Sequence, residues 1–432
     1  MALRVKLALA GSLLAAAFAP AQVTTYTEAS LGYPVPIPVD SPTPVEGFRT
    51  YQALLTRHTD LWLAHDHITR VQVGSTRRGE PIFAYRFSDA DDLTVDGVPR
   101  EGGVMINGTI HAREWASPEI LTQFFEKLAL DYGTDPIVTW LVDQDRIVLL
   151  PVLNIDGFLV TQTYPNQQYA SSEGRMRRKN LLSTDGDLFT ISDNLLGVDL
   201  NRNFPEGWSA SSSTPSSQTY RGPLPLSEPE TNALVQAITL FTDDEQLRCY
   251  YDVHGAIPAI YYVLHSKPSI DTQTTTLLAR MQNAFRATNG IPSSYGGISV
   301  SPGEAIGATD EYHGYVHEVP SYTIEYPTPN YRDGGPSGNT FILPMDEVSQ
   351  VVDENIKAMM LGVMFAAGPP ILERVTIWTD DNANGGIDEG EVAYCAGWSP
   401  DGSGRVWSVT TGDGSVPAGR AYNVLLQFNR PM

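Results

Sequence analysis

Cysteine and basic side chains are both scarce in this sequence of 432 residues. The two cysteines, Cys249 and Cys395, can form one bridge at most, so a hydrophobic core or a bound metal, rather than a disulfide framework, must stabilise the fold. The sequence leaves open whether they are bonded. Only 28 lysines and arginines stand against 50 aspartates and glutamates, giving a formal net charge of -22. Because such a surface repels phosphate groups, we expect neither nucleic acid nor anionic membranes as partners.

Long hydrophobic runs are also absent, except near the N-terminus. There, Arg4 and Lys6 precede an apolar stretch over residues 7–18, and the small-residue pattern Ala19-Pro20-Ala21 follows it. This order is typical of a secretory signal peptide that is cleaved after Ala21. The stretch is shorter than the roughly 20 residues of a membrane-spanning helix, which argues against an uncleaved anchor. We therefore expect residues 1–21 to be removed and the mature protein to be secreted, extracellular or periplasmic, without membrane attachment.

Hydrophobic patterning divides the rest of the chain into three parts. Residues 22–45 are rich in proline and predict an extended lead-in. Residues 46–368 alternate between helix-like and strand-like patterns, which predicts an α/β domain with a mixed central β-sheet sandwiched between helices. After Gly368-Pro369-Pro370, residues 369–432 have only short strand-like runs between turns. This last part predicts a small β-rich C-terminal domain.

The expected elements can be given by their residue numbers. Apolar runs rich in Val, Ile or Tyr predict buried strands over 103–106, 146–152, 247–253, 260–264 and 322–326. Two further strands are expected around a glycine turn, over 69–73 and 82–87. Helical periodicity predicts helices over 51–67, 117–132, 228–241, 270–287 and 346–365. In the C-terminal domain, strands are expected over 374–378, 406–410 and 422–428.

Polar side chains gather directly after the strand expected over 103–106. His111 and Glu114 are three residues apart and can offer an imidazole nitrogen and a carboxylate to one ion, a combination that suits zinc. His254 follows another buried strand and can supply a third ligand, which leaves a fourth position for water, as catalysis requires. By itself, a His-x-x-Glu pair is a weak signal, and the alternative is an ion pair at the surface.

A longer motif strengthens the signal. His111-Ala112-Arg113-Glu114-Trp115 resembles the zinc-binding signature of the metallocarboxypeptidases related to pancreatic carboxypeptidases A and B. The resemblance spans about residues 46 to 366, and by it the chain is identified as a secreted, bacterial-like member of this family. Four further segments resemble motifs of the family in the same order, namely residues 146–158, 175–179, 197–205 and 322–326.

The resemblance implies a reaction and a set of residues. It implies a secreted zinc-dependent carboxypeptidase that hydrolyses the C-terminal peptide bond of peptides or proteins, using water activated by one Zn²⁺ and a glutamate as general base. We expect this enzyme to be a monomer. The implied zinc ligands are His111, Glu114 and His254; the catalytic residues are the general base Glu325 and the oxyanion-stabilising Arg178; the substrate-binding residues are Arg113, Asn201, Arg202 and Thr309.

The chemistry of these side chains agrees with the implied roles. A planar C-terminal carboxylate is best bound by a bidentate guanidinium, which Arg202 beside the amide of Asn201 can offer. A glutamate in an apolar strand, as Glu325 is, is hard to explain by structure alone, because a buried unpaired charge is costly. Without the zinc motif, Arg178 and Arg202 would instead be interpreted as surface residues that form exposed ion pairs.

Two positions depart from the family pattern. In the family a mobile tyrosine closes over the substrate, but residues 299–312 have no tyrosine at the equivalent spacing, and Pro302 stands there instead. Tyr295, in the preceding loop, is the tyrosine that could reach into the site. Thr309 occupies the position that tunes the side-chain pocket and is neither aliphatic nor acidic. The preferred C-terminal residue is therefore open, and broad or apolar specificity is expected.

A second metal site is expected in the C-terminal domain. Residues 380–391 fit the 12-residue calcium loop of an EF-hand, with Gly385 at the sixth position. An EF-hand has a helix on each side, whereas residues 374–378 resemble a strand, so the alternative is a solvated acidic turn. The expected Ca²⁺ ligands are Asp380, Asn382, Asn384, Gly386, Asp388 and Glu391.

Two other functions stay open at this point. A zinc amidase or peptidase acting on cell-wall peptides would apply the same zinc chemistry to a different amide bond. An inactive binding protein would keep the carboxypeptidase fold and use the C-terminal domain for attachment. The presence of His111, Glu114, His254 and Glu325 together argues against the second alternative.

Overall fold

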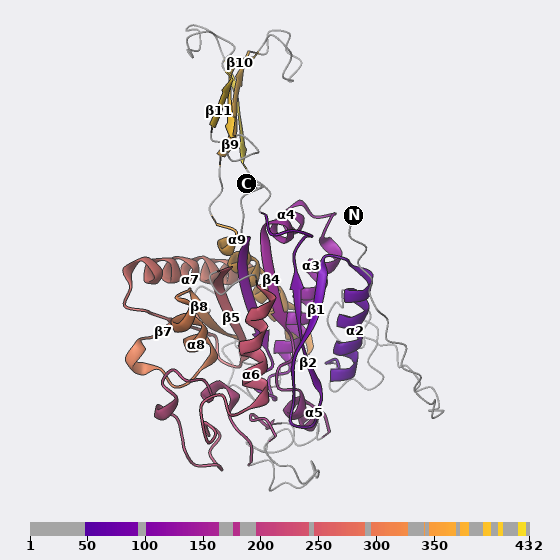
Figure 1. The fold of residues 1–432 in the computed structure, drawn as a ribbon, viewed down its shortest axis with the longest axis vertical. Coiled ribbons are helices and arrows are strands. Elements are labelled where there is room, and N and C mark those ends of the chain that lie inside the picture. Colours follow the sequence, from indigo (N-terminus) through magenta and orange to yellow (C-terminus); the bar gives the residue numbers. More distant parts are fainter. Residues whose placement is uncertain are drawn as a thin grey trace, which may run out of the picture.

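The computed structural model describes residues 48–93, 101–163, 176–181, 196–241, 246–289, 295–326, 341, 345–368, 372–379, 392–398, 405–408 and 422–428. Within these ranges, an eight-stranded sheet forms the centre of the molecule, and a four-stranded sheet projects from one end of it (Figure 1). The predicted signal peptide, residues 1–21, and the lead-in, residues 22–45, lie outside the described residues and stay predictions. No helix in the described ranges is long and apolar enough to cross a membrane.

The central sheet is mixed. Its strands are β1 Ile68–Ser75, β2 Pro81–Phe87, β3 Gly102–Gly108, β4 Asp145–Leu150, β5 Leu247–Gly255, β6 Ala259–Val263, β7 Gly296–Val300 and β8 Ser321–Tyr326. Their spatial order is β1-β2-β4-β3-β5-β8-β6-β7. The inner strands β4, β3, β5 and β8 are parallel, whereas β2 and β6 pair with them antiparallel. The sheet therefore has a parallel centre and antiparallel flanks.

Helices cover both faces of this sheet. They are α2 Tyr51–Ala64, α3 Ala116–Asp131, α4 Pro136–Gln144, α5 Ile155–Thr163, α6 Pro229–Gln236, α7 Pro268–Asn289, α8 Thr309–His317 and α9 Met345–Ala366. Successive residues of β5 point to opposite faces. Tyr250 stacks on His313 of α8, with ring centroids 4.1 Å apart, whereas Tyr251 lies against Gly362 of α9, where an added Cβ would clash with its ring. The predicted α/β sandwich is thus confirmed.

The buried strands explain why the sequence predicts this core well. Every residue of β3 is buried, and in β5 only Arg248 is exposed. Strands covered on both faces appear in a sequence as continuous apolar runs, which is the pattern from which they are predicted. The sequence does not predict β7, whose residues are mostly exposed, or the short helices α4, α5 and α8, whose length or polarity hides their periodicity.

The start of α3 differs from its prediction. The pattern Ser117-Pro118 predicts a helix capped by Ser117, but α3 begins one residue earlier, and Trp115 stands at the cap without a side-chain hydrogen bond. The Ser117 hydroxyl instead accepts a hydrogen bond from the backbone N–H of Thr109 at 2.9 Å and donates to the carbonyl of Val253 at 2.7 Å. Ser117 therefore ties the turn after β3 to the neighbouring strand β5.

The C-terminal sheet contains β9 Leu372–Trp378, β10 Val392–Trp398, β11 Arg405–Ser408 and β12 Asn423–Phe428, in the order β11-β10-β9-β12. All its pairs are antiparallel. The predicted calcium loop, residues 380–391, lies outside the described residues, and both segments that flank it, β9 and β10, are strands, so the helices of an EF-hand are absent there. Cys249 is a free, buried thiol of β5, and burial raises its pKa to about 12.

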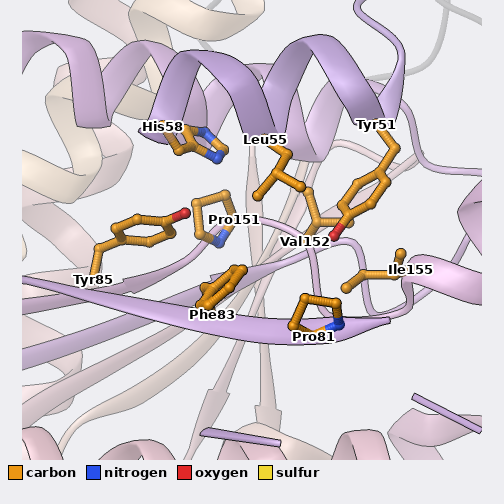
Figure 2. A pocket seen from close by; sticks show the side chains of 9 residues that line it. All are labelled: Tyr51, Leu55, His58, Pro81, Phe83, Tyr85, Pro151, Val152 and Ile155. Carbon is orange, nitrogen blue, oxygen red and sulfur yellow. The ribbon is translucent and has the colours of Figure 1, made fainter. Parts of the chain in front are cut away.

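A small cavity lies beneath α2 (Figure 2). The side chains around it include Tyr51, His58, Phe83 and Tyr85. A water-sized sphere can occupy about 20 Å³ of this space, which is room for roughly one water molecule. None of the residues predicted to form the active site lines it. This cavity is therefore a packing feature of the core and not the candidate functional site.

Glu230, in the first turn of α6, is a buried carboxylate with incomplete hydrogen bonding. Asn180 donates its Nδ2 to Oε2 of Glu230 at 3.1 Å, whereas Oε1 is buried without a hydrogen-bond partner. Burial raises the pKa of Glu230 from 4.5 to about 7, and the charges of Glu228 and Asp156 add to this effect. The folded protein therefore retains a proton on Glu230 at pH values where the unfolded chain has lost it.

We expect Glu230→Gln to raise the melting temperature at pH 8 and to change it little at pH 5. Because the folded-state pKa of Glu230 exceeds the unfolded value, unfolding releases a proton between about pH 4.5 and 7, and stability falls as the pH rises through this window. At pH values above this window, the free energy of unfolding is lower by on the order of 3 kcal/mol. Glutamine carries no titratable proton, so the variant avoids this loss. Thermal melts at pH 5 and pH 8 measure the change in melting temperature, with Asp60→Asn, at an exposed position, as control. An equal rise in melting temperature at both pH values would contradict the argument.

Candidate metal centre and active site

The candidate site lies at one edge of the central sheet, where three neighbouring parallel strands end. β3, β5 and β8 lie side by side, and the chain leaves each of them at the same edge. His111 follows β3, His254 is the second-last residue of β5, and Glu325 is opposite His254 in the register of β8. Side chains that are far apart in sequence therefore meet beyond the carboxyl ends of these strands, where α/β proteins commonly bind ligands.

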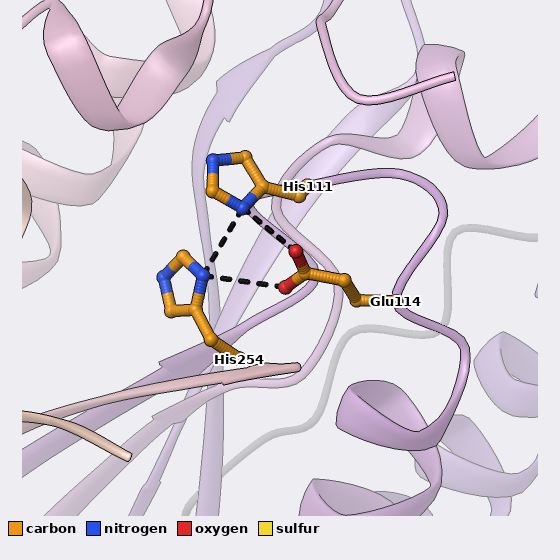
Figure 3. A group of neighbouring side chains, drawn as sticks. All are labelled: His111, Glu114 and His254. Carbon is orange, nitrogen blue, oxygen red and sulfur yellow. Dashed lines mark hydrogen bonds and ion pairs between the residues drawn. The ribbon is translucent and has the colours of Figure 1, made fainter. Parts of the chain in front are cut away.

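His111, Glu114 and His254 come together there (Figure 3). Nδ1 of His111 is 2.9 Å from Oε1 of Glu114. Nδ1 of His254 is 3.1 Å from Nδ1 of His111 and 3.2 Å from Oε2 of Glu114. Ligand atoms about 2.0–2.2 Å from a tetrahedral zinc ion are roughly 3.3 Å apart. The spacing of these three buried side chains therefore matches the spacing that one zinc ion requires.

A buried aspartate holds the other nitrogen of each imidazole. Nε2 of His111 is 3.1 Å from Oδ1 of Asp199, and Nε2 of His254 is 2.6 Å from Oδ2 of Asp252. Because an ionised carboxylate only accepts hydrogen bonds, each Nε2 carries a hydrogen, and in the neutral form of each imidazole Nδ1 keeps its lone pair. Two lone pairs and the Glu114 carboxylate then face one another, which a cation between them stabilises. The donor set therefore fits zinc, and the two aspartates orient the histidines.

The electrostatics of the cluster also favour a positive charge at this point. Burial lowers the pKa of His254, but Asp252 and Glu114 outweigh burial and raise it well above its ordinary value. Burial raises the pKa of Glu114, but His111 and His254 outweigh it and hold that pKa well below its usual range. The backbone N–H of Gly255 also donates to Oε2 of Glu114, at 3.1 Å. The cluster thus keeps Glu114 ionised and ready to bind a cation.

Glu325 faces the same region from β8. Its Oε2 is buried without a hydrogen-bond partner. The pKa of Glu325 is raised to about 7, mainly by burial; Glu114 adds to the rise, whereas His254 and Arg178 oppose it. A carboxyl group with a pKa near neutrality can both accept and donate a proton at physiological pH. The buried surroundings of Glu325 therefore suit this side chain to general acid–base chemistry.

Two arginines lie beside the cluster. Nε of Arg178 donates to Oδ2 of Asp199 at 2.9 Å, so the aspartate that holds His111 also fixes Arg178. Burial raises the pKa of Asp199, but Arg178 outweighs it and keeps that pKa well below its usual range. Arg113 stacks 3.8 Å from the ring centre of Phe341, and burial, with Arg178 adding, lowers its pKa to about 10. Both cations are thus concentrated at the site of an otherwise acidic protein.

Asn201 and Arg202 belong to a short 3-10 helix, Leu200–Arg202. Oδ1 of Asp199 accepts a hydrogen bond from the backbone N–H of Asn201 at 3.1 Å, which caps this helix. Oδ1 of Asn201 accepts from the backbone N–H of Thr309 at 2.8 Å, which joins the helix to the start of α8. Arg202 is mostly buried; burial lowers its pKa, and Asp199 opposes the shift. The structure thus places Asn201, Arg202 and Thr309 together next to the cluster.

Thr309 lies at the site, whereas Tyr295 packs elsewhere. Thr309 is fully buried, and its hydroxyl donates to Oδ2 of Asp252 at 3.3 Å, so it lies directly behind the His254–Asp252 pair. Its effect on specificity stays a prediction. The interpretation of Tyr295 as a residue that reaches into the site is wrong. Its hydroxyl donates to Glu354 of α9 at 3.0 Å, and its ring stacks on Phe285 of α7 at 3.8 Å.

Sequence reasoning assigned no role to Asp199 or Asp252. Asp199 stands two residues before Asn201, inside a motif already singled out. Asp252 stands two residues before His254 in a strand, and residues two apart in a strand share a face, so this spacing could have indicated a contact.

Comparison with known proteins agrees with this geometry. Residues 58–358 match the protein-family model described as zinc carboxypeptidase. This chain belongs to the zinc carboxypeptidase family. The resemblance found in the sequence motifs is therefore confirmed. The C-terminal sheet, which begins at Leu372, lies outside the matched residues.

Individual proteins of known name are similar to this chain in sequence or in fold. It is 29% identical to carboxypeptidase A1 of Mus musculus over 312 residues, which cover 71% of this chain and 65% of the relative. It is also 29% identical to carboxypeptidase A1 of Rattus norvegicus over 298 residues, which cover 68% of this chain and 64% of that relative. The chain thus spans just under two thirds of the length of these relatives. The structure of carboxypeptidase A from Helicoverpa armigera has the same fold, with a TM-score of 0.59, 24% identity and 74% coverage of each chain.

Proposed function

We propose that this chain is a zinc metallocarboxypeptidase that removes the C-terminal residue of peptides and proteins. The observation that carries the proposal is the convergence of His111, Glu114 and His254 on one point, with Glu325, whose Oε2 is buried without a hydrogen-bond partner, opposite His254 in the sheet. Membership of the zinc carboxypeptidase family and the carboxypeptidase names of the relatives support the same reaction. A Zn²⁺ ion is the cofactor that this donor set fits.

A zinc ion bound by the three side chains would polarise the scissile carbonyl and make a water molecule a stronger nucleophile. Glu325 accepts a proton from the attacking water and then delivers it to the leaving amide nitrogen, and its pKa of about 7 suits both steps. Arg178, which Asp199 holds in place, stabilises the negative charge that develops on the carbonyl oxygen.

The substrate is bound through its terminal carboxylate. Arg202 can form two parallel hydrogen bonds to this planar group, with the amide of Asn201 as a further donor, and such clamps select free C-termini over internal segments. Arg113, whose guanidinium lies over the ring of Phe341, binds the substrate further toward its N-terminus. The direction from Arg202 to Arg113 then fixes which peptide bond reaches Glu325.

The decisive experiment uses a panel of peptides that differ only in the last residue, incubated with the purified mature protein and followed by mass spectrometry. We expect stepwise loss of C-terminal residues, abolished by a zinc chelator and restored by added Zn²⁺. Absence of cleavage would favour cell-wall peptides as substrates or a binding protein without activity. Cleavage at internal bonds would contradict the role of Arg202.

We further propose that the protein is exported. The charged, apolar and small-residue segments within residues 1–21 support this, as they are typical of a cleaved signal. N-terminal sequencing of the protein recovered outside the cell is expected to begin at Gln22. Recovery of the uncleaved chain inside the cell would contradict export.

A further inference from the structure

A chain of buried hydrogen bonds lies behind His254, on the side of the sheet that α8 covers. Asp252 uses both of its carboxylate oxygens: Oδ2 is 2.6 Å from Nε2 of His254, and Oδ1 accepts from Nδ2 of Asn107 at 2.7 Å. Oδ1 of Asn107 in turn accepts a hydrogen bond from the hydroxyl of Tyr250. All four side chains are buried. The chain from Tyr250 to His254 therefore runs through the interior of the protein.

The pairing of β3 with β5 brings these side chains together. Asn107 of β3 is opposite Asp252 of β5 in the parallel register. Residues two apart in one strand share a face, so Tyr250, Asp252 and His254 form one row along β5. Residues opposite each other in neighbouring strands also share a face, which places the Asn107 side chain beside the middle of this row. Backbone pairing thus sets the contact between Asn107 and Asp252.

The direction of each hydrogen bond in this chain follows from its chemistry. An ionised carboxylate only accepts hydrogen bonds, so Asn107 turns its NH₂ group toward Asp252. The amide oxygen of Asn107 then faces Tyr250, whose hydroxyl donates to it. Burial, with the charge of Asp252 adding, raises the pKa of Tyr250 well above its ordinary value, so the phenol keeps the hydrogen that it donates. Tyr250 therefore holds the Asn107 amide in the orientation that Asp252 requires.

The second oxygen of each site aspartate is held by a different kind of group. Oδ2 of Asp199 accepts from the guanidinium of Arg178 at 2.9 Å, whereas Oδ1 of Asp252 accepts from the neutral amide of Asn107. With this bond in place, the Asp252 carboxylate cannot rotate without breaking a buried hydrogen bond, which costs free energy. Its Oδ2 stays directed at Nε2 of His254, and Nδ1 of that imidazole stays turned toward the other two candidate ligands.

We propose that Asn107 is a positioning residue for the zinc site: by holding Asp252, it fixes the orientation of the His254 imidazole and raises the affinity of the protein for Zn²⁺. This inference rests on the zinc site of the proposed function. Partners that orient a metal-binding histidine contribute about 10- to 100-fold to metal affinity. Asn107 acts through Asp252 and takes no part in the reaction itself. Tyr250 supports it by fixing its amide.

The test measures the loss of zinc from the loaded protein to a competing chromophoric chelator, which does not depend on turnover. Asn107→Leu keeps a similar volume and removes both polar groups, so we expect it to raise the Kd for zinc about 10- to 100-fold. Tyr250→Phe removes one hydroxyl and should raise this Kd about three- to tenfold. If Asn107→Leu does not fold, Tyr250→Phe decides the test, and an unchanged Kd then overturns the inference.

The matched control is Asn355→Leu. Asn355 is an equally buried asparagine on α9, and its Nδ2 donates to the carbonyl of Val351 at 2.8 Å. The control removes a buried amide far from the candidate ligands in the chain, so it should lower the melting temperature and leave the Kd for zinc unchanged. A rise in Kd equal to that of Asn107→Leu would show general destabilisation and overturn the inference.

A double-mutant cycle shows whether Asn107 acts through Asp252. In an Asp252→Ala background the carboxylate that Asn107 holds is gone, so Asn107→Leu and Tyr250→Phe should each change the Kd for zinc by less than about twofold. The same rise in both backgrounds would contradict a role through Asp252 and overturn the inference.

Peptide hydrolysis by the same samples separates this inference from the proposed function. Tight zinc binding that does not depend on Asn107 would overturn the inference alone. Zinc binding that depends on Asn107, in a protein that hydrolyses no peptide, would support the inference and reject the proposed reaction. An unmodified protein without affinity for zinc would overturn both.

Discussion

Replacing Glu325 by glutamine is expected to lower kcat by about a thousandfold or more while the protein still binds zinc. Proton transfer by a positioned general base contributes roughly 10²- to 10⁴-fold to catalysis, and glutamine cannot accept the proton. Glu325 is not one of the three clustered side chains that fit the ion, so the zinc content should not change. Steady-state kinetics on a peptide with a free C-terminus, together with metal analysis of the same sample, measure both quantities.

The matched control is Glu318→Gln, which neutralises an exposed glutamate that pairs with Lys267 at the surface. It should leave kcat unchanged, which separates the effect of Glu325 from a general change in protein charge. KM should change little in the Glu325 variant, because Arg202 still binds the substrate. Loss of zinc together with activity would show that Glu325 holds the metal rather than the proton, and unchanged kcat would remove it from the mechanism.

A second large effect is expected for Arg202→Gln, which should lower kcat/KM by roughly 30-fold or more on peptides with a free terminal carboxylate. Removing one partner of a buried, hydrogen-bonded charge pair costs about 2–5 kcal/mol. The loss should appear mainly in KM, because Arg202 binds the substrate and takes no part in proton transfer. Initial rates over a range of peptide concentrations separate the two parameters.

Two comparisons make the Arg202 experiment specific. Arg286→Gln removes an exposed arginine whose guanidinium bonds Asn283 on α7, and it should have no effect. A peptide with an amidated C-terminus lacks the carboxylate, so the unmodified enzyme should cleave it poorly and Arg202→Gln should make little further difference. If the variant discriminates between acid and amide peptides as well as the unmodified enzyme does, another residue binds the carboxylate.

The centre of the fold could be predicted from sequence because its signals are local. Buried strands such as β3 and β5 appear as apolar runs, and His111, Glu114 and Arg113 occur within one short motif. The edge of the sheet could not be predicted in this way. β7 is mostly exposed and has no apolar pattern, and α8 begins at Thr309 after Ala308, which has no capping side chain.

The residues that hold the candidate zinc ligands in place are harder to predict from the sequence than the ligands themselves. Asp252 acts on His254 only because both point to one face of β5 and the imidazole turns its Nε2 toward the carboxylate. Tyr295 shows the opposite case. Its place in a loop before Pro302 suggested access to the substrate, whereas packing between Phe285 and Glu354 buries it. Loop residues are the least constrained by local pattern, so only the tertiary contacts decide their position.

The wide separation along the chain of the side chains proposed to bind zinc has a consequence for the order of folding events. The residues of the His111–His254 pair are 143 positions apart and meet only after β3 and β5 have paired in parallel. Contacts between such distant segments form slowly, because closing the long loop between them costs conformational entropy before the contact contributes any favourable free energy. We therefore expect zinc to be taken up only after the sheet has formed. Added zinc should slow unfolding of the finished protein, since it binds the native state alone, and should leave the rate of folding almost unchanged.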